Sequence, residues 1–215
     1  MTLSLRNIGY AHGDTADSVV FSDFSHDFHS GEMVAVTGPS GAGKTTLLSL
    51  LSLLINPNDG EIWFGDRLLN RLDVEQVQQV RRAEIGMIFQ TARVFSQLTI
   101  LEHIEFARAC SQTSISQEEV DALVDALGLR PRLDAIPSAL SGGERTRLAS
   151  LLALAKNPRL MLADEPTASL DQRNSQVLLS LLRKLADRLG TIAVLVTHDP
   201  VAVEACDRSL VLTKN

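Results

Sequence analysis

The segment Gly38-Pro-Ser-Gly-Ala-Gly-Lys-Thr-Thr46 constrains the fold more than any other part of this chain. It follows the apolar run from Met33 to Thr37 and opens a leucine-rich run from Lys44 to Ile55. The pattern G-x-x-x-x-G-K-[ST] between a strand and a helix is typical of a phosphate-binding loop, because its glycines let backbone N–H groups converge on phosphate oxygens. The N-terminus of the helix adds about half a positive charge. We therefore expect a strand, a phosphate-binding loop and a helix here.

Short apolar runs alternate with longer helical patterns along the rest of the chain. Such alternation is typical of parallel strands joined by helical crossovers, so we expect an α/β fold with a mostly parallel sheet. The expected buried strands are 33–37, 85–89, 160–163 and 192–197, and the expected helices are 44–55, 118–127, 143–155 and 175–189.

Two further regions complete the expected organisation. The first 30 residues and residues 61–69 indicate an antiparallel β flank. Residues 91–157 carry no strong strand pattern, and we expect them to form a helical subdomain inserted in the phosphate-loop core. The whole chain, residues 1–215, is then a single domain with an inserted lobe.

The composition excludes several classes of protein. With 215 residues, of which 45% are hydrophobic and 21% charged, the chain can bury a large core and is not disordered. The net charge of −6 and the lack of a basic run disfavour a nucleic-acid partner. The two cysteines, Cys110 and Cys206, have no ligand-like or disulfide spacing, which fits a reducing cytoplasm.

The hydropathy pattern gives no sign of a membrane-spanning segment. The N-terminal residues lack the basic start and apolar stretch of a signal peptide. The longest apolar-rich run, residues 47–55, is about half the length needed to cross a bilayer. If the protein works at a membrane, we expect a second polypeptide to hold it there.

The apolar run from Leu160 to Ala163 ends in two acids, Asp164 and Glu165. Beside a phosphate-binding loop, Asp164 is placed to hold magnesium directly or through water, and Glu165 to polarise an attacking water. Lys44 would reach the β- and γ-phosphates, and the hydroxyl of Thr45 would coordinate the magnesium. An acid pair standing alone would more often be a solvated turn.

Polar residues follow other expected strands as well. Gln90 follows the strand 85–89, and His198 follows the strand 192–197. Because ligands of open parallel sheets bind outside the carboxyl ends of the strands, we expect these side chains to converge with the acid pair on one crevice.

A second glycine-rich helix start lies about a hundred residues after the first. The segment Leu140-Ser-Gly-Gly-Glu144 precedes a long apolar run through Ala155. Exposed backbone N–H groups at a helix start form an anion-binding site. Taken alone, the segment is equally consistent with an ordinary helix cap.

These segments, in this order, resemble the nucleotide-binding domain of ABC transporters over almost the whole chain. The resemblance identifies Gly38 to Thr46 as Walker A, Gln90 as the Q-loop glutamine, Leu140 to Glu144 as the signature motif, Asp164-Glu165 as the end of Walker B, Ser169-Leu-Asp171 as the D-loop and His198 as the switch histidine. Within the family, the sequence is most similar to the bacterial macrolide-export, lipoprotein-release and cell-division ATPases.

The resemblance implies bound ATP and Mg2+ and a role for each site residue. The nucleotide-binding residues would be Tyr10, which stacks on adenine, with Gly38, Pro39, Ser40, Gly41, Ala42, Gly43, Lys44, Thr45, Thr46, Ser141, Gly142, Gly143, Glu144 and Asp171. The magnesium ligands would be Thr45, Gln90 and Asp164, and the catalytic residues Glu165, His198, Gln90 and Lys44.

The resemblance also implies the partners. In the family, the signature motif of one subunit closes over the γ-phosphate held by Walker A of its partner, so the active species would be a homodimer with two ATP molecules. The dimer would drive a separate membrane permease from the cytoplasmic face of the inner membrane. Gln90 and residues 95–106 would transmit closure, although the apolar side chains of that region are equally consistent with an ordinary lobe core.

Two departures from the family pattern stand out. Glu144 replaces the commoner glutamine at the end of the signature, and Leu151-Leu-Ala153 stands where the family usually has Ala-Arg-Ala.

The expected activity is Mg-dependent ATP hydrolysis coupled to export or extraction of a hydrophobic compound, lipoprotein or peptide. The alternative is an ATP-gated dimer that pulls on a membrane complex without moving a solute. A soluble ATPase of DNA repair or translation is disfavoured because no coiled-coil insertion or second cassette is present.

Overall fold

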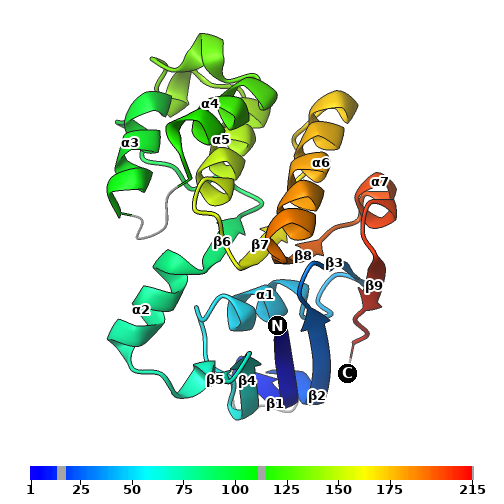
Figure 1. The fold of residues 1–215 in the computed structure, drawn as a ribbon. Coiled ribbons are helices and arrows are strands. Elements are labelled where there is room, and N and C mark those ends of the chain that lie inside the picture. The colour runs from blue at the N-terminus through cyan, green and yellow to red at the C-terminus, as the bar shows by residue number, and fades with distance from the viewer. Residues whose placement is uncertain (14–17, 111–114, 215) are drawn as a thin grey trace.

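The computed structural model describes residues 1–13, 18–110 and 115–214 (Figure 1). Its strands are β1 (Thr2–Ala11), β2 (Val19–His29), β3 (Met33–Thr37), β4 (Asp59–Phe64), β5 (Arg67–Leu68), β6 (Ile85–Ile88), β7 (Leu160–Asp164), β8 (Ile192–Val196) and β9 (Arg208–Val211). Its α-helices are α1 (Lys44–Leu51), α2 (Val74–Ala83), α3 (Ile100–Cys110), α4 (Gln117–Ala126), α5 (Gly142–Leu154), α6 (Gln172–Leu189) and α7 (Pro200–Glu204).

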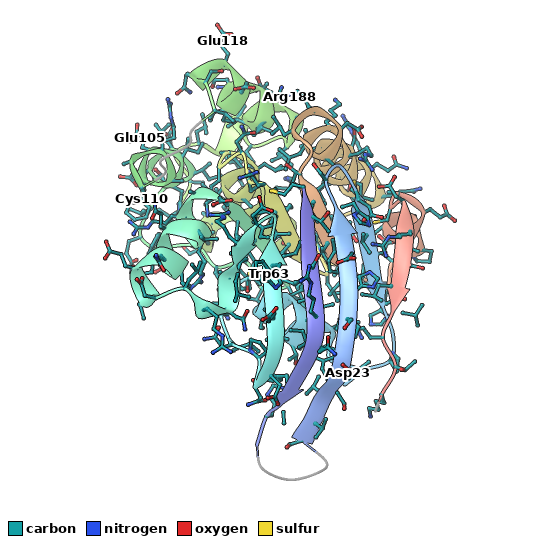
Figure 2. All side chains as sticks on the ribbon, turned by 60° about the horizontal axis from the view of Figure 1, so that its bottom comes forward. Asp23, Trp63, Glu105, Cys110, Glu118 and Arg188 are labelled. Carbon is teal, nitrogen blue, oxygen red and sulfur yellow. The ribbon has the colours of Figure 1, made fainter. Side chains whose placement is uncertain are left out.

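The strands form two sheets. The order in the first is β2-β1-β4-β5, and all of its pairs are antiparallel. The order in the second is β6-β7-β8-β3-β9, and all of its pairs are parallel. In Figure 2, Trp63 and Asp23 lie on the antiparallel sheet, while Glu105, Cys110 and Glu118 lie on the helices at the opposite end of the molecule. The predicted α/β fold with an antiparallel flank is confirmed.

Strands β3, β6, β7 and β8 of the parallel sheet are buried on both faces, which explains why they are almost wholly apolar. Alternate residues such as Val34, Leu162 and Val194 pack with α1 and the antiparallel sheet in one core cluster. The residues between them, such as Met161 and Leu195, pack against α6 in a second cluster. Because strands β3, β6, β7 and β8 are packed from both sides, the loops at their carboxyl ends rest on a rigid support.

Helices α3, α4 and α5 form a separate lobe with its own core. The buried residues of this lobe include Ile100, Ile104, Val120, Leu148 and Leu151. Ser116 and Ser141 cap α4 and α5, and each is part of a reciprocal capping box. Figure 1 shows the lobe projecting beyond the parallel sheet, with α5 leading back toward β7. These helices lie within residues 91–157, where the sequence predicted a helical subdomain.

Several element boundaries differ from the predictions. Helix α1 ends at Leu51 rather than Ile55, because Leu53 adopts a φ of 57° that a helix cannot accommodate. Helix α2 was not predicted because its sequence is strongly polar and only Val80 is buried. Its one clear signal is the capping box between Asp73 and Gln76. No helix in the described part of the chain is long and apolar enough to span a membrane.

Candidate functional site

A cavity of about 820 Å3 opens at the carboxyl end of β3. It is lined by residues 40–46 of the glycine-rich loop, His12, residues 18–20, His198, Thr213 and Lys214. The loop thus lies where ligands of open parallel sheets bind. His12 and Lys214 were not predicted as site residues, because neither belongs to a recognisable motif.

The glycine-rich loop wraps around the side chain of Lys44. The Lys44 ammonium donates hydrogen bonds to the carbonyl oxygens of Gly38 and Pro39, at 2.8 and 2.9 Å. Gly38 has a φ of 140°, and a Cβ at this position would lie 2.2 Å from the carbonyl oxygen of Leu212. Only glycine therefore allows the loop to leave β3 beneath the segment that follows β9.

Asp164 is the last residue of β7 and lies beside Thr45 of the glycine-rich loop. Its carboxylate accepts a hydrogen bond from Thr45. Burial, followed by the negative charge of Glu165, raises the pKa of Asp164 above its usual value, while Thr45 and Lys44 act in the opposite direction. An oxygen-rich pair with surplus negative charge fits the ligand preference of a magnesium ion.

Glu165 adopts a strained backbone conformation directly after the strand. Its φ is 46°, in the left-handed region that non-glycine residues rarely occupy. The backbone N–H of Glu165 donates to the carbonyl oxygen of Val196 at 2.9 Å, which ties the turn to the end of β8. This hydrogen bond thus holds an acid, in a strained conformation, where the ends of β7 and β8 meet.

His198 approaches Glu165 from β8, whereas Gln90 stands apart. The backbone N–H of His198 donates to Oε2 of Glu165 at 3.4 Å, and its Nε2 lies 3.9 Å from Oε1. His198 also lines the cavity, as the sequence predicted. Gln90 follows β6, the neighbour of β7, but it is exposed and is not among the lining residues of the cavity.

His12 lines the cavity, whereas Tyr10, the predicted adenine-stacking residue, does not. Tyr10 is partly buried against the main core and does not line the cavity. The ring of His12 does, and its Nε2 lies 3.3 Å from the hydroxyl of Thr46. The two rings meet edge to face, with centroids 5.2 Å apart. The Tyr10 ring therefore supports the His12 ring through this contact.

The predicted signature residues lie outside this cavity. The hydroxyl of Ser141 accepts the backbone N–H of Glu144, and the Glu144 carboxylate accepts the backbone N–H of Ser141. Arg132 binds Glu144 at 2.9 Å, and this hydrogen bond, followed by the one from the Ser141 N–H, lowers the pKa of Glu144 to about 2. The segment thus caps the helix through these hydrogen bonds. It also leaves the helix start open to a ligand, because a Cβ at Gly142 would meet nothing within 4 Å.

Asp171, the predicted D-loop acid, caps α6. Its carboxylate accepts the backbone N–H of Asn174 at 2.8 Å, and this hydrogen bond is the main reason that the pKa of Asp171 is lowered. Asp171 is exposed and does not line the cavity. One chain therefore brings together the phosphate loop, the acid pair and His198, but not the signature segment or Asp171.

A phosphate-binding loop between β3 and α1, with an acid pair at the end of β7, defines an α/β phosphate-loop protein. The chain belongs to the ABC transporter family, whose model matches residues 21–168. The family resemblance seen in the sequence is confirmed.

Individual relatives extend this likeness over almost the whole chain. The lipoprotein-releasing system ATP-binding protein LolD of Shewanella oneidensis is 36% identical over 206 residues, which cover 94% of this chain and 89% of LolD. The macrolide export ATP-binding/permease protein MacB of Salmonella choleraesuis is 35% identical over 209 residues, which cover 96% of this chain and 32% of MacB.

Two solved structures share the fold at 30% identity. The dimeric structure of MJ0796, a bacterial ABC transporter cassette, matches with a TM-score of 0.89 and covers 99% of this chain and 94% of that one. A dimeric post-hydrolysis state of the same cassette, bound to ADP and Pi, matches with a TM-score of 0.87 and covers 100% of this chain and 97% of that one.

Proposed function

We propose that this chain is the Mg-dependent ATP-binding and ATP-hydrolysing subunit of a lipoprotein-releasing or related export system. The observation that carries the proposal is the contact between the phosphate loop and the acid pair: Thr45, which lines the cavity, donates a hydrogen bond to Asp164, and Asp164 is next to Glu165. Three chemical needs of phosphoryl transfer are present there: amide donors, a lysine and oxygen ligands for magnesium. The likeness to LolD and to a cassette solved with ADP and Pi supports the same function.

Each group of the site has a task in this proposal. Lys44 exchanges its two carbonyl partners for oxygens of the β- and γ-phosphates, and the amides of residues 41–46 bind the same phosphates. Thr45, Asp164 and Gln90 would hold a magnesium ion, which would neutralise phosphate charge. Glu165 orients the attacking water, and His198 supports the carboxylate and the γ-phosphate.

His12 takes the adenine-stacking role in this proposal, in place of Tyr10. A ring that lines the phosphate-loop cavity and is braced by Thr46 and Tyr10 can stack on a base without reorganising. Aromatic rings, including that of histidine, can stack on any base, because every base has a π face.

Dimerisation on ATP follows from the separation of the two anion-binding helix starts. The start of α5 leaves the side of Gly142 open, yet no residue of this segment lines the cavity of its own chain. In a homodimer, the N–H groups of Gly142 and Gly143 and the Ser141 hydroxyl of one copy would complete the γ-phosphate site of the other. The dimeric state of the MJ0796 cassette supports this arrangement.

A basic and aromatic groove beside α2 is the proposed permease contact. It consists of two adjoining hollows of about 420 and 230 Å3. The residues common to both are Arg82, Arg93, Leu152 and Lys156. Exposed Phe95 and Phe106 meet edge to face at one end, with centroids 5.2 Å apart. Leu152 belongs to the segment that departs from the family pattern, and here its side chain faces the groove.

The charge of this groove indicates the chemistry of the permease segment. The chain as a whole carries a net charge of −6, whereas the shared residues of the groove include three cations. An amphipathic cytoplasmic segment with acidic side chains and an apolar face is complementary to it. The subunit would then sit on the cytoplasmic face of the inner membrane.

The experiment that tests the proposal uses the purified Glu165→Gln variant with ATP and magnesium. We expect an ATP-bound dimer by analytical ultracentrifugation, and Lys44→Ala in the same background as a control that remains monomeric. A Glu165→Gln chain with wild-type turnover, or no dimer at any ATP concentration, contradicts the proposal.

The alternative, a signalling dimer without solute transport, requires a different measurement. Co-purification from membranes identifies the permease, and reconstitution of both proteins in vesicles measures release of a lipoprotein on ATP addition. ATP hydrolysis without any release favours the signalling role.

A further inference from the structure

Helix α5 is fastened near its start to the segment that follows the acid pair. The hydroxyl groups of Thr146 and Ser169 are hydrogen-bonded at 2.7 Å. Thr146 is buried, whereas Ser169 is exposed. Neither hydroxyl has a task in the ATP chemistry proposed above, so the contact needs another explanation.

The two glycines at the start of α5 have different surroundings. A Cβ at Gly142 would meet nothing within 4 Å, so the backbone there is open to a ligand. A Cβ at Gly143 would lie 3.0 Å from the carbonyl oxygen of Ser169 and 3.6 Å from Cδ2 of Leu170. Gly143 therefore allows close approach of the segment 169–171 to the helix, next to the Thr146 contact.

Two charged residues, Arg147 and Asp171, interact at the same contact between α5 and residues 169–171. The side chain of Arg147 also lies beside Gly143, since a Cβ there would be 3.8 Å from its Nη1, and its Nε is buried without a hydrogen-bond partner among the described residues. The pKa of Asp171 is lowered first by Asn174 and then by the charge of Arg147. A hydrogen bond, a close packing contact and an electrostatic attraction thus hold residues 169–171 on the start of α5.

We infer that Thr146 and Ser169 are a positioning pair that makes the start of α5 and residues 169–171 move as one unit. The inference rests on the proposed ATP-dependent dimer. Because α5 belongs to the helical lobe and residues 169–171 follow strand β7 of the core, this pair joins the two parts of the chain. The open helix start and the adjoining segment therefore reach the nucleotide of a second copy in a fixed mutual orientation.

The test measures the dissociation constant of the ATP-bound dimer in the Glu165→Gln background. The variants are Thr146→Val, Ser169→Ala and the double variant, with Thr146→Ser as the conservative control. A net hydrogen bond corresponds to about fivefold in an equilibrium constant, and a dimer contains two such pairs. Because the bond forms within each copy, it acts on the dimer only by fixing the orientation of the two segments, so each single variant should weaken the dimer by a measurable factor of at most about 25. The double variant should be no weaker than either single one, and Thr146→Ser should restore the wild-type value.

The remaining outcomes distinguish the inference from the proposed function. ATP binding to the monomer should not change, because neither hydroxyl lines the cavity. Additive effects, or a lower Tm with an unchanged dimer constant, would show a merely structural contact and overturn the inference. If Thr146→Val does not fold, Ser169→Ala at the exposed end decides alone. A Glu165→Gln background that stays monomeric with ATP and magnesium overturns the proposed function, and the inference with it.

Discussion

Replacing His12 by alanine should separate recognition of the base from recognition of the phosphates. His12 lines the cavity and contacts the Thr46 hydroxyl, whereas the Lys44 ammonium binds the carbonyl oxygens of Gly38 and Pro39. A stacked base contributes about 1–3 kcal/mol when its aromatic partner is replaced by alanine. Because this imidazole is exposed before a ligand arrives, we take the lower part of that range, about 1–2 kcal/mol. The Kd for ATP should then increase by about 5- to 30-fold.

Isothermal titration calorimetry with ATP and with tripolyphosphate measures the two parts of this expectation. His12→Ala should weaken ATP binding and leave tripolyphosphate binding within about twofold of wild type, while His12→Phe should restore ATP affinity. Tyr10→Leu is the matched control, and it should have a smaller effect because that ring only supports His12. If Tyr10→Leu loses most of the ATP affinity and His12→Ala loses little, the assignment of His12 is wrong.

Other substitutions test the phosphate and metal side of the site. Glu165→Gln should slow ATP hydrolysis at least about a hundredfold in a steady-state assay without weakening ATP binding. Lys44→Ala should abolish measurable ATP binding in calorimetry, since Lys44 is the cation held within the phosphate loop. Asp164→Asn should raise the Tm of the nucleotide-free chain near neutral pH and abolish Mg-dependent turnover. Because the pKa of Asp164 is raised, ionisation destabilises the fold, so this gain in Tm should vanish as pH falls through that pKa. In an NMR titration, the Glu144 carboxylate should become protonated only when the pH falls to its pKa of about 2.

The sequence was sufficient for strands β3, β6, β7 and β8 of the parallel sheet, because the signals for these strands are local. Each strand is short and apolar, and its polar successor marks the carboxyl end, as at Asp164 and His198. The helices α5 and α6 were also predicted to within a few residues, although α6 begins after the Asp171 cap, at Gln172, rather than at Ser175.

Elements whose formation depends on tertiary contacts were not predicted. Strand β9 is short and half exposed, and it is defined only by its pairing with β3. The end of α1 depends on the left-handed conformation of Leu53, which no residue-type pattern reveals. His12 was missed for a related reason, because the strand that leads to it has register shifts that decide which ring reaches the cavity.

The charge at the start of α5 decides whether that helix can receive a phosphate. A free Glu144 carboxylate would repel a triphosphate, yet here it accepts the Ser141 N–H and pairs with Arg132 at 2.9 Å. The capping box uses the N–H groups of Ser141 and Glu144, which leaves those of Gly142 and Gly143 for a ligand. Replacing Arg132 by glutamine should therefore weaken the ATP-bound dimer, whereas Arg132→Gln combined with Glu144→Gln should restore it. If the Arg132→Gln variant dimerises as well as the wild type, Arg132 has no part in preparing this helix start for an anion.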